Sequence, residues 1–141
     1  MDAVTSTSTR PSAHRRLHIG LWIAQVVLAI AFTLAGVLKI MMPAAELAQD
    51  GGPLALPVAL ARFIGATEVF AAIGLILPAA TRIRPMLTLL AAAGLVVVMV
   101  LAAGFHLFRG ELYAIPINMA LAGLAAFVAW GRFCGAPIRA R

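Results

Sequence analysis

The sequence has few charged residues for its length. Only 11% of its 141 residues are Asp, Glu, Lys or Arg, whereas an ordinary globular domain has about 25%. Hydrophobic residues make up 63%, against the usual ~45–50%. So few charged residues cannot cover the surface of a soluble domain. The length of the chain allows one domain. The sequence therefore indicates a membrane protein.

The sequence also lacks the residues that most redox and metal sites require. Its one cysteine, Cys134, excludes a disulfide within the chain, a dithiol redox cycle and a cysteine-rich zinc site. Of three histidines only His106 lies in a long apolar run, so one chain cannot hold a membrane haem between two histidines. Motifs of nucleotide-binding loops, zinc proteases and serine hydrolases are missing. We expect no metal and no cofactor built from the chain alone, and redox chemistry would need a quinone-like molecule or a partner protein.

What the sequence has in abundance is long apolar runs. Each has about 18–24 residues, and a helix of about 20 residues crosses the ~30 Å hydrocarbon layer of a bilayer. Strands of membrane barrels are shorter and alternate in polarity, so the runs predict an all-α fold. The predicted spans are residues 20–42, 57–80, 86–108 and 113–130. The short links between them favour an antiparallel four-helix bundle.

Polar segments flank this membrane domain, which we place at residues 19–132. Residues 1–18 are predicted to form a disordered basic tail, and residues 133–141 a short basic one. The first span is longer than the apolar core of a signal peptide and no A-x-A site follows it, so we interpret it as an uncleaved helix. In the first link we expect one or two helical turns over 44–49, before the turn at 51–53.

The distribution of arginines predicts the orientation of the bundle. Eight arginines lie before the first span, in the link between the second and third spans and after the fourth span, whereas the other side has Arg109, with Arg62 near it. Basic residues gather on the cytoplasmic side of membrane proteins. We therefore predict that both termini lie inside (N-in/C-in). The net charge of +6 reflects this bias and contact with anionic headgroups, and we expect no nucleic-acid partner.

A few polar residues interrupt the apolar runs. They are Gln25 and Lys39 in the first span, Arg62 and Glu68 in the second, His106 in the third and Asn118 in the fourth. A charge at mid-bilayer costs about 2.5–3.5 kcal/mol on insertion scales, so such side chains normally face the protein interior and find partners. Their positions along the spans predict one polar cluster in the outer half of the bundle, which is the candidate site.

Lys39 and Glu68 are the centre of this prediction. Glu68 lies deepest, and the long side chain of Lys39 can reach it from the neighbouring helix. Arg62 and His106 are the alternative partners. Two interpretations of a Lys39–Glu68 pair stay open, because such a pair can fix helix packing or take part in function.

Small residues accompany these two charged ones. Gly36 stands three residues before Lys39, and Gly65 three residues before Glu68, so each glycine shares a helix face with its charged neighbour. This pattern is expected at a pocket or at a close helix crossing.

An ordered set of segments across the four spans resembles the DoxX-like family. The similarity runs from about Leu21 to Arg132 and includes QVVLA at 25–29, AGVLKI at 35–40, RFIGATEV at 62–69, GLILP at 74–78, His106, RGE at 109–111, Asn118 and VAWGR at 128–132. The resemblance implies a small four-helix protein of the bacterial inner membrane. The family takes its name from a subunit of a thiosulfate:quinone oxidoreductase, and other relatives resemble membrane partners of soluble redox-defence enzymes.

Three functions fit these features. The first is an accessory or anchoring subunit of a quinone-linked redox or stress-defence complex, with a soluble oxidoreductase or a second copy as partner. The second is a binding protein or enzyme for a lipid-soluble molecule, quinone-like or isoprenoid, which Glu68 and Lys39 would orient or protonate. The third, a small proton-coupled exporter, is disfavoured because such exporters carry their membrane carboxylate in the first helix, where this chain has Lys39. Whether the chain catalyses a reaction stays open, and no residue is assigned as catalytic.

The orientation is tested at Cys134, which follows the last span. With both termini inside, an impermeant maleimide should label Cys134 only after the membrane is opened. A Tyr113→Cys change in a Cys134→Ser background places the thiol at the opposite side and should be labelled in intact cells. Labelling of Cys134 itself in intact cells would contradict the prediction.

Overall fold

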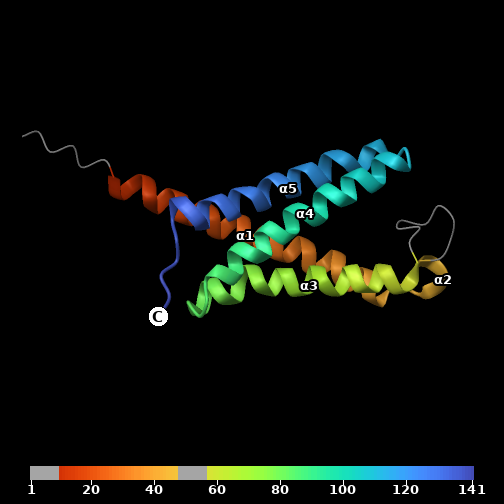
Figure 1. Ribbon diagram of the computed structural model, residues 1–141, viewed down its shortest axis with the longest axis horizontal. Helices are drawn as coiled ribbons and strands as arrows, with labels where there is room; N and C mark the ends of the chain where they lie inside the picture. The colour runs from red at the N-terminus through yellow and green to blue at the C-terminus, as the bar shows by residue number, and fades with distance from the viewer. Residues whose placement is uncertain (1–9, 48–56) are drawn as a thin grey trace, which may run out of the picture.

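The computed structural model describes residues 10–47 and 57–141. Within these ranges the chain is helical and has no strand (Figure 1). The long helices are α1 (Arg10–Met41), α3 (Val58–Thr81), α4 (Met86–Phe108) and α5 (Ile115–Trp130), and the short elements are α2 (Ala44–Leu47), the 3-10 turn η1 (Leu112–Ala114) and the π-helical turn η2 (Gly131–Gly135). The predicted all-α four-helix bundle is confirmed.

The outward faces of the helices carry large apolar side chains. Phe70 is 73% exposed, and Leu34 and Leu101 are each 67% exposed. Four helical stretches are long and apolar enough to cross a bilayer: Ala13–Met41, Val58–Thr81, Met86–Phe108 and Leu112–Gly135. Such surfaces are stable against lipid chains and unstable against water. The chain is therefore a multi-pass integral membrane protein.

The four helices form two antiparallel pairs. α1 packs along α3, and α4 packs along α5. Figure 1 shows α1 and α4 crossing near the middle of the bundle and the α4–α5 pair separating from the α1–α3 pair toward the right, where α2 lies. We call the end where α1 begins and α5 ends the basic end, and the opposite end the distal end. The basic end carries Arg15, Arg16, Arg82, Arg84, Arg132 and Arg139.

The core shared by all four helices lies toward the basic end. It consists of Ala24, Leu28 and Phe32 from α1, Ala72 and Leu75 from α3, Ala92, Leu95 and Met99 from α4, and Ala122, Ala125 and Val128 from α5. Alanines at these positions let the helix backbones approach closely. Because the two helix pairs diverge beyond this core, side chains near the distal end are buried between the two helices of one pair.

The start of α1 corrects one prediction. The helix begins at Arg10, so the disordered tail expected over residues 1–18 is wrong for residues 10–18. The physical reason is tertiary contact, because Leu17 packs against Gly135 beyond the end of α5. Extending a helix that already exists adds one hydrogen bond per residue without a new nucleation cost.

The other boundaries agree closely with the sequence. α3 and α4 match the second and third spans within one residue, and α5 ends at Trp130 as expected, but η2 continues the helix to Gly135, into the segment predicted as a tail. In the first link α2 covers Ala44–Leu47 of the expected turns. The predicted glycine turn at 51–53 lies outside the described residues, as do residues 1–9 of the tail.

α1 and α3 cross at minimal distance where two glycines face each other. A Cβ atom on Gly36 would lie 2.5 Å from the carbonyl oxygen of Gly65, and one on Gly65 would lie 2.7 Å from the carbonyl oxygen of Gly36. Both obstacles are backbone atoms, which cannot rotate away. Of the two alternatives that the glycines left open, the structure has the close crossing.

Alanine at either glycine should force the two helices apart. We expect Gly36→Ala and Gly65→Ala each to lower the free energy of unfolding by about 1–3 kcal/mol, the usual cost of overpacking, in thermal or denaturant unfolding in detergent. Gly94→Ala is the matched control, because a Cβ there meets nothing within 4 Å. It should be neutral or stabilising, since alanine favours a helix over glycine by up to about 1 kcal/mol. Equal effects at all three positions would contradict the close crossing.

Candidate functional site

Lys39 and Glu68 form an ion pair at the α1–α3 crossing. Nζ of Lys39 donates to both carboxylate oxygens of Glu68, at 2.7 Å to Oε1 and 2.6 Å to Oε2. The side chain of Glu68 is only 4% exposed and that of Lys39 is 16% exposed. The glycine crossing one turn away brings the two backbones close enough for this contact. The predicted pairing is confirmed.

This pair neutralises two charges that the membrane interior would otherwise exclude. Breaking a buried pair leaves one uncompensated charge, at a typical cost of about 3–5 kcal/mol. Lys39 lies near the end of α1 and Glu68 nearer the middle of α3. The lysine therefore reaches inward to the carboxylate and fixes the position of one helix along the other.

A second ionic group closes the turn between α4 and α5. Nδ1 of His106 lies 2.6 Å from Oε2 of Glu111, and Nε of Arg109 donates to Oε1 at 2.6 Å. Because a carboxylate only accepts, Nδ1 of His106 is the donor. Hydrogen bonds from His106 and then Arg109 hold the pKa of Glu111 below its usual range. The guanidinium of Arg109 also lies 5.6 Å from the centre of the Phe105 ring.

Two predicted site residues take no part in either group. Nδ2 of Asn118 is buried and donates to the carbonyl oxygen of Ala114 at 3.0 Å, within the start of its own helix. Arg62 is exposed, and in the part of the chain that the structure describes it forms no ion pair. Neither side chain is placed beside the carboxylate of Glu68.

Gln25 belongs to a third group, at the basic end. Its amide nitrogen donates to the carbonyl oxygen of Leu75 on α3, and its Oε1 accepts from Nε of Arg132 at 2.8 Å and from Nη2. Gln25 is fully buried and Arg132 is 6% exposed. Nη1 of Arg132 lies 3.3 Å from Nδ1 of His18, and its guanidinium lies 5.3 Å from the Trp22 ring. This network joins α1, α3 and the turn after α5.

The single outer cluster predicted from the sequence is not formed. Lys39 and Glu68 lie on the α1–α3 pair, and His106 lies on the α4–α5 pair, which Figure 1 shows apart at the distal end. Across the described ranges no hydrogen bond or ion pair joins these two groups. The sequence shows how far along its helix each polar residue lies, but it does not show that the two helix pairs diverge.

Arg132 was missed because it lies after the end of the fourth predicted span. In the structure η2 turns it back toward α1, over a separation of 107 residues from Gln25. A signal was present in α1, where His18, Trp22 and Gln25 follow one another at steps of four and three residues and therefore share a helix face.

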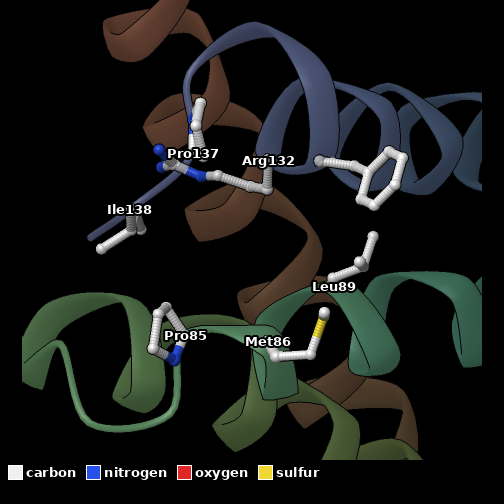
Figure 2. Close-up of a pocket in the computed structure, with 7 residues that line it drawn as sticks. Pro85, Met86, Leu89, Arg132, Pro137 and Ile138 are labelled. Atoms are coloured by element: carbon white, nitrogen blue, oxygen red, sulfur yellow. The ribbon is translucent and has the colours of Figure 1, made fainter. Parts of the chain in front are cut away.

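Two cavities adjoin this network. The apolar cavity, of about 310 Å³, is lined by Pro85 just before α4, by Met86 and Leu89 of α4, and by Arg132, Phe133, Pro137 and Ile138. Figure 2 shows Arg132 and Pro137 facing Met86 and Leu89 across it. The basic cavity, of about 340 Å³, is lined by His14, His18, Trp22, Ala79, Ala80, Arg82, Pro137, Ile138 and Arg139. Among the described residues no group of three His, Cys, Asp or Glu is placed to hold a metal ion.

A double-mutant cycle measures the ion pair. Lys39→Met leaves the buried Glu68 carboxylate without its partner and should destabilise more than Glu68→Gln, because the freed lysine can extend to the headgroups. In the Lys39→Met/Glu68→Gln double variant the losses should not add, with a coupling of about 0.5–3 kcal/mol in unfolding free energy. Arg62→Gln, at an exposed position of the same helix, is the control and should change little. Additive losses would show that the pair contributes nothing.

Comparison with known proteins identifies the family. A model of the DoxX-like family matches residues 23–128. No curated protein and no solved structure matches the chain. The matched region contains all of α3 and α4, most of α5 and residues 23–41 of α1. The chain therefore belongs to the DoxX-like family.

Proposed function

We propose that this protein is an accessory subunit that anchors a quinone-linked redox or stress-defence complex to the inner membrane. The observation that carries the proposal is the closed Lys39–Glu68 pair. One ammonium occupies both oxygens of the carboxylate. The side chains best suited to move a proton within the spans are thus engaged in holding α1 to α3.

The lateral surface supports an anchoring role. Apolar side chains such as Phe63, Ile73 and Leu90 are exposed along the spans and are suited to contact lipid. Exposed charged side chains that the structure describes, such as Arg15, Arg62 and Arg82, lie toward the two ends, where a soluble partner can dock. The resemblance to membrane partners of redox enzymes supplies the redox part of the proposal.

The alternative is a binding protein or enzyme for a lipid-soluble molecule, such as a quinone or an isoprenoid, with Glu68 and Lys39 acting on it. Its expected site was the polar cluster of the outer half. The polar residues of that cluster instead divide among separate groups, and the two cavities at the basic end are lined by other residues. This arrangement favours the anchoring role.

The experiment compares how well the wild type and a variant without the charged Lys39–Glu68 pair restore function in cells that lack the chain. In cells that lack the chain, we expect a soluble oxidoreductase to leave the membrane fraction and quinone reduction by membranes to fall. The wild type and the Lys39→Met/Glu68→Gln double variant should restore both to within about twofold, because anchoring needs the fold and not the charges. Native mass spectrometry of the purified protein should show the oxidoreductase in stoichiometric amount.

Two outcomes would overturn the proposal. One is a double variant that is folded and present at the wild-type level but fails to restore quinone reduction, which would assign chemistry to the pair. The other is a protein purified without any partner but carrying a quinone. Folding of the double variant is checked separately by its unfolding temperature, with Gly94→Ala as a variant that should behave as wild type.

A further inference from the structure

The basic end holds a buried cation that has no anionic partner in the described part of the chain. Arg132 is 6% exposed, and among the described residues no carboxylate lies within 4.0 Å of its guanidinium nitrogens. The carboxylate side chains that the structure describes, those of Glu46, Glu68 and Glu111, all lie on elements or turns toward the distal end. A buried charge is costly unless it is paired. Gln25 and the Trp22 ring solvate this guanidinium but carry no negative charge.

The hydrogen-bonding groups around Arg132 include more donors than acceptors. Nε1 of Trp22 lies 3.1 Å from Nε2 of His18, and Nη1 of Arg132 lies 3.3 Å from Nδ1 of the same ring. A neutral imidazole accepts at one nitrogen and donates at the other, and indole and guanidinium groups only donate. The ring therefore cannot accept from both neighbours, and one N–H is left without an acceptor among the residues that the structure describes.

The basic cavity offers space for an acceptor beside His18 and Trp22, whereas Arg132 itself lines the apolar cavity and adjoins the basic one through His18. His18 and Trp22 form part of its wall, together with the exposed side chains of His14, Arg82 and Arg139. The segment Pro137–Ile138 lines this cavity and the apolar cavity alike. Several cationic or donor groups from α1, α3 and the segment after η2 thus surround one hollow of about 340 Å³.

We propose that the basic cavity binds a phosphate group, supplied by the headgroup of an anionic phospholipid. Phosphate accepts several charge-assisted hydrogen bonds at once and suits arginine in particular. The lipid is favoured as the source because the cavity lies at the ends of the spans, at the depth of the headgroups, where basic pockets between helices recognise anionic lipids. This site is independent of the anchoring function proposed above.

The test uses the full-length protein in mild detergent with phosphatidylglycerol or phosphatidylcholine of identical acyl chains. Both lipids carry a phosphate, but the choline group adds a positive charge that the arginines repel. Native mass spectrometry should show phosphatidylglycerol retained about tenfold or more tightly, since each arginine near the headgroup adds to the attraction. The preference should fall about tenfold in the Arg82→Gln/Arg139→Gln double variant and in Arg132→Gln.

Arg84→Gln is the matched control, because Arg84 lies in the same turn as Arg82 but lines neither cavity. It should keep the preference within about twofold. Because Arg132→Gln can disturb folding, the double variant of exposed arginines decides the outcome. Equal retention of the two lipids, or an equal loss in Arg84→Gln, would overturn the proposal. If millimolar inorganic phosphate alone raised the unfolding temperature as much as phosphatidylglycerol does, the lipid would be rejected as the source.

Discussion

The close approach of α1 and α3 at Gly36 and Gly65 is the constraint on which the distal half of the structure depends. Because neither position has a side chain, the backbone of each helix lies close to a glycine carbonyl oxygen of the other. The backbones are then near enough for Lys39 to reach Glu68 without leaving either charge exposed to lipid. The ion pair can stabilise the crossing because the crossing brings the two charges together. Charges held farther apart would each bear the full cost of burial.

The two ends of the bundle satisfy their buried polar groups differently. At the distal end each described pair is complete, because Glu68 is matched by Lys39, and Glu111 by His106 and Arg109. At the basic end Arg132 has only neutral partners within residues 10–47 and 57–141, and among these residues its network is short of acceptors. The divergence of the helix pairs keeps these groups separate, so the acids of one end cannot compensate the cations of the other.

Much of the fold followed from the sequence because the bilayer allows few solutions. Apolar runs of the right length predict helices, and a lone lysine and a lone glutamate in neighbouring spans predict a pair. The prediction of one shared outer cluster was wrong because the position of a residue along its span does not show which helices diverge. Arg132 was beyond reach because a π-helical turn returns it to Gln25 across most of the chain, and nothing local to its sequence marks that turn.

Counting the hydrogen-bond and ion-pair partners of each buried polar group distinguishes structural from ligand-binding roles in this molecule. Lys39 and Glu68 complete each other, so their geometry is explained by helix packing alone and needs no external molecule. Arg132 and His18 do not complete each other, because two donors face a ring that accepts only once. Both observations rest on the same rule, that a polar group removed from water needs its hydrogen bonds made elsewhere. Applied to the distal end, the rule favours a scaffold; applied to the basic end, it leaves one N–H without an acceptor among the described residues, and a lipid headgroup is the acceptor that we propose.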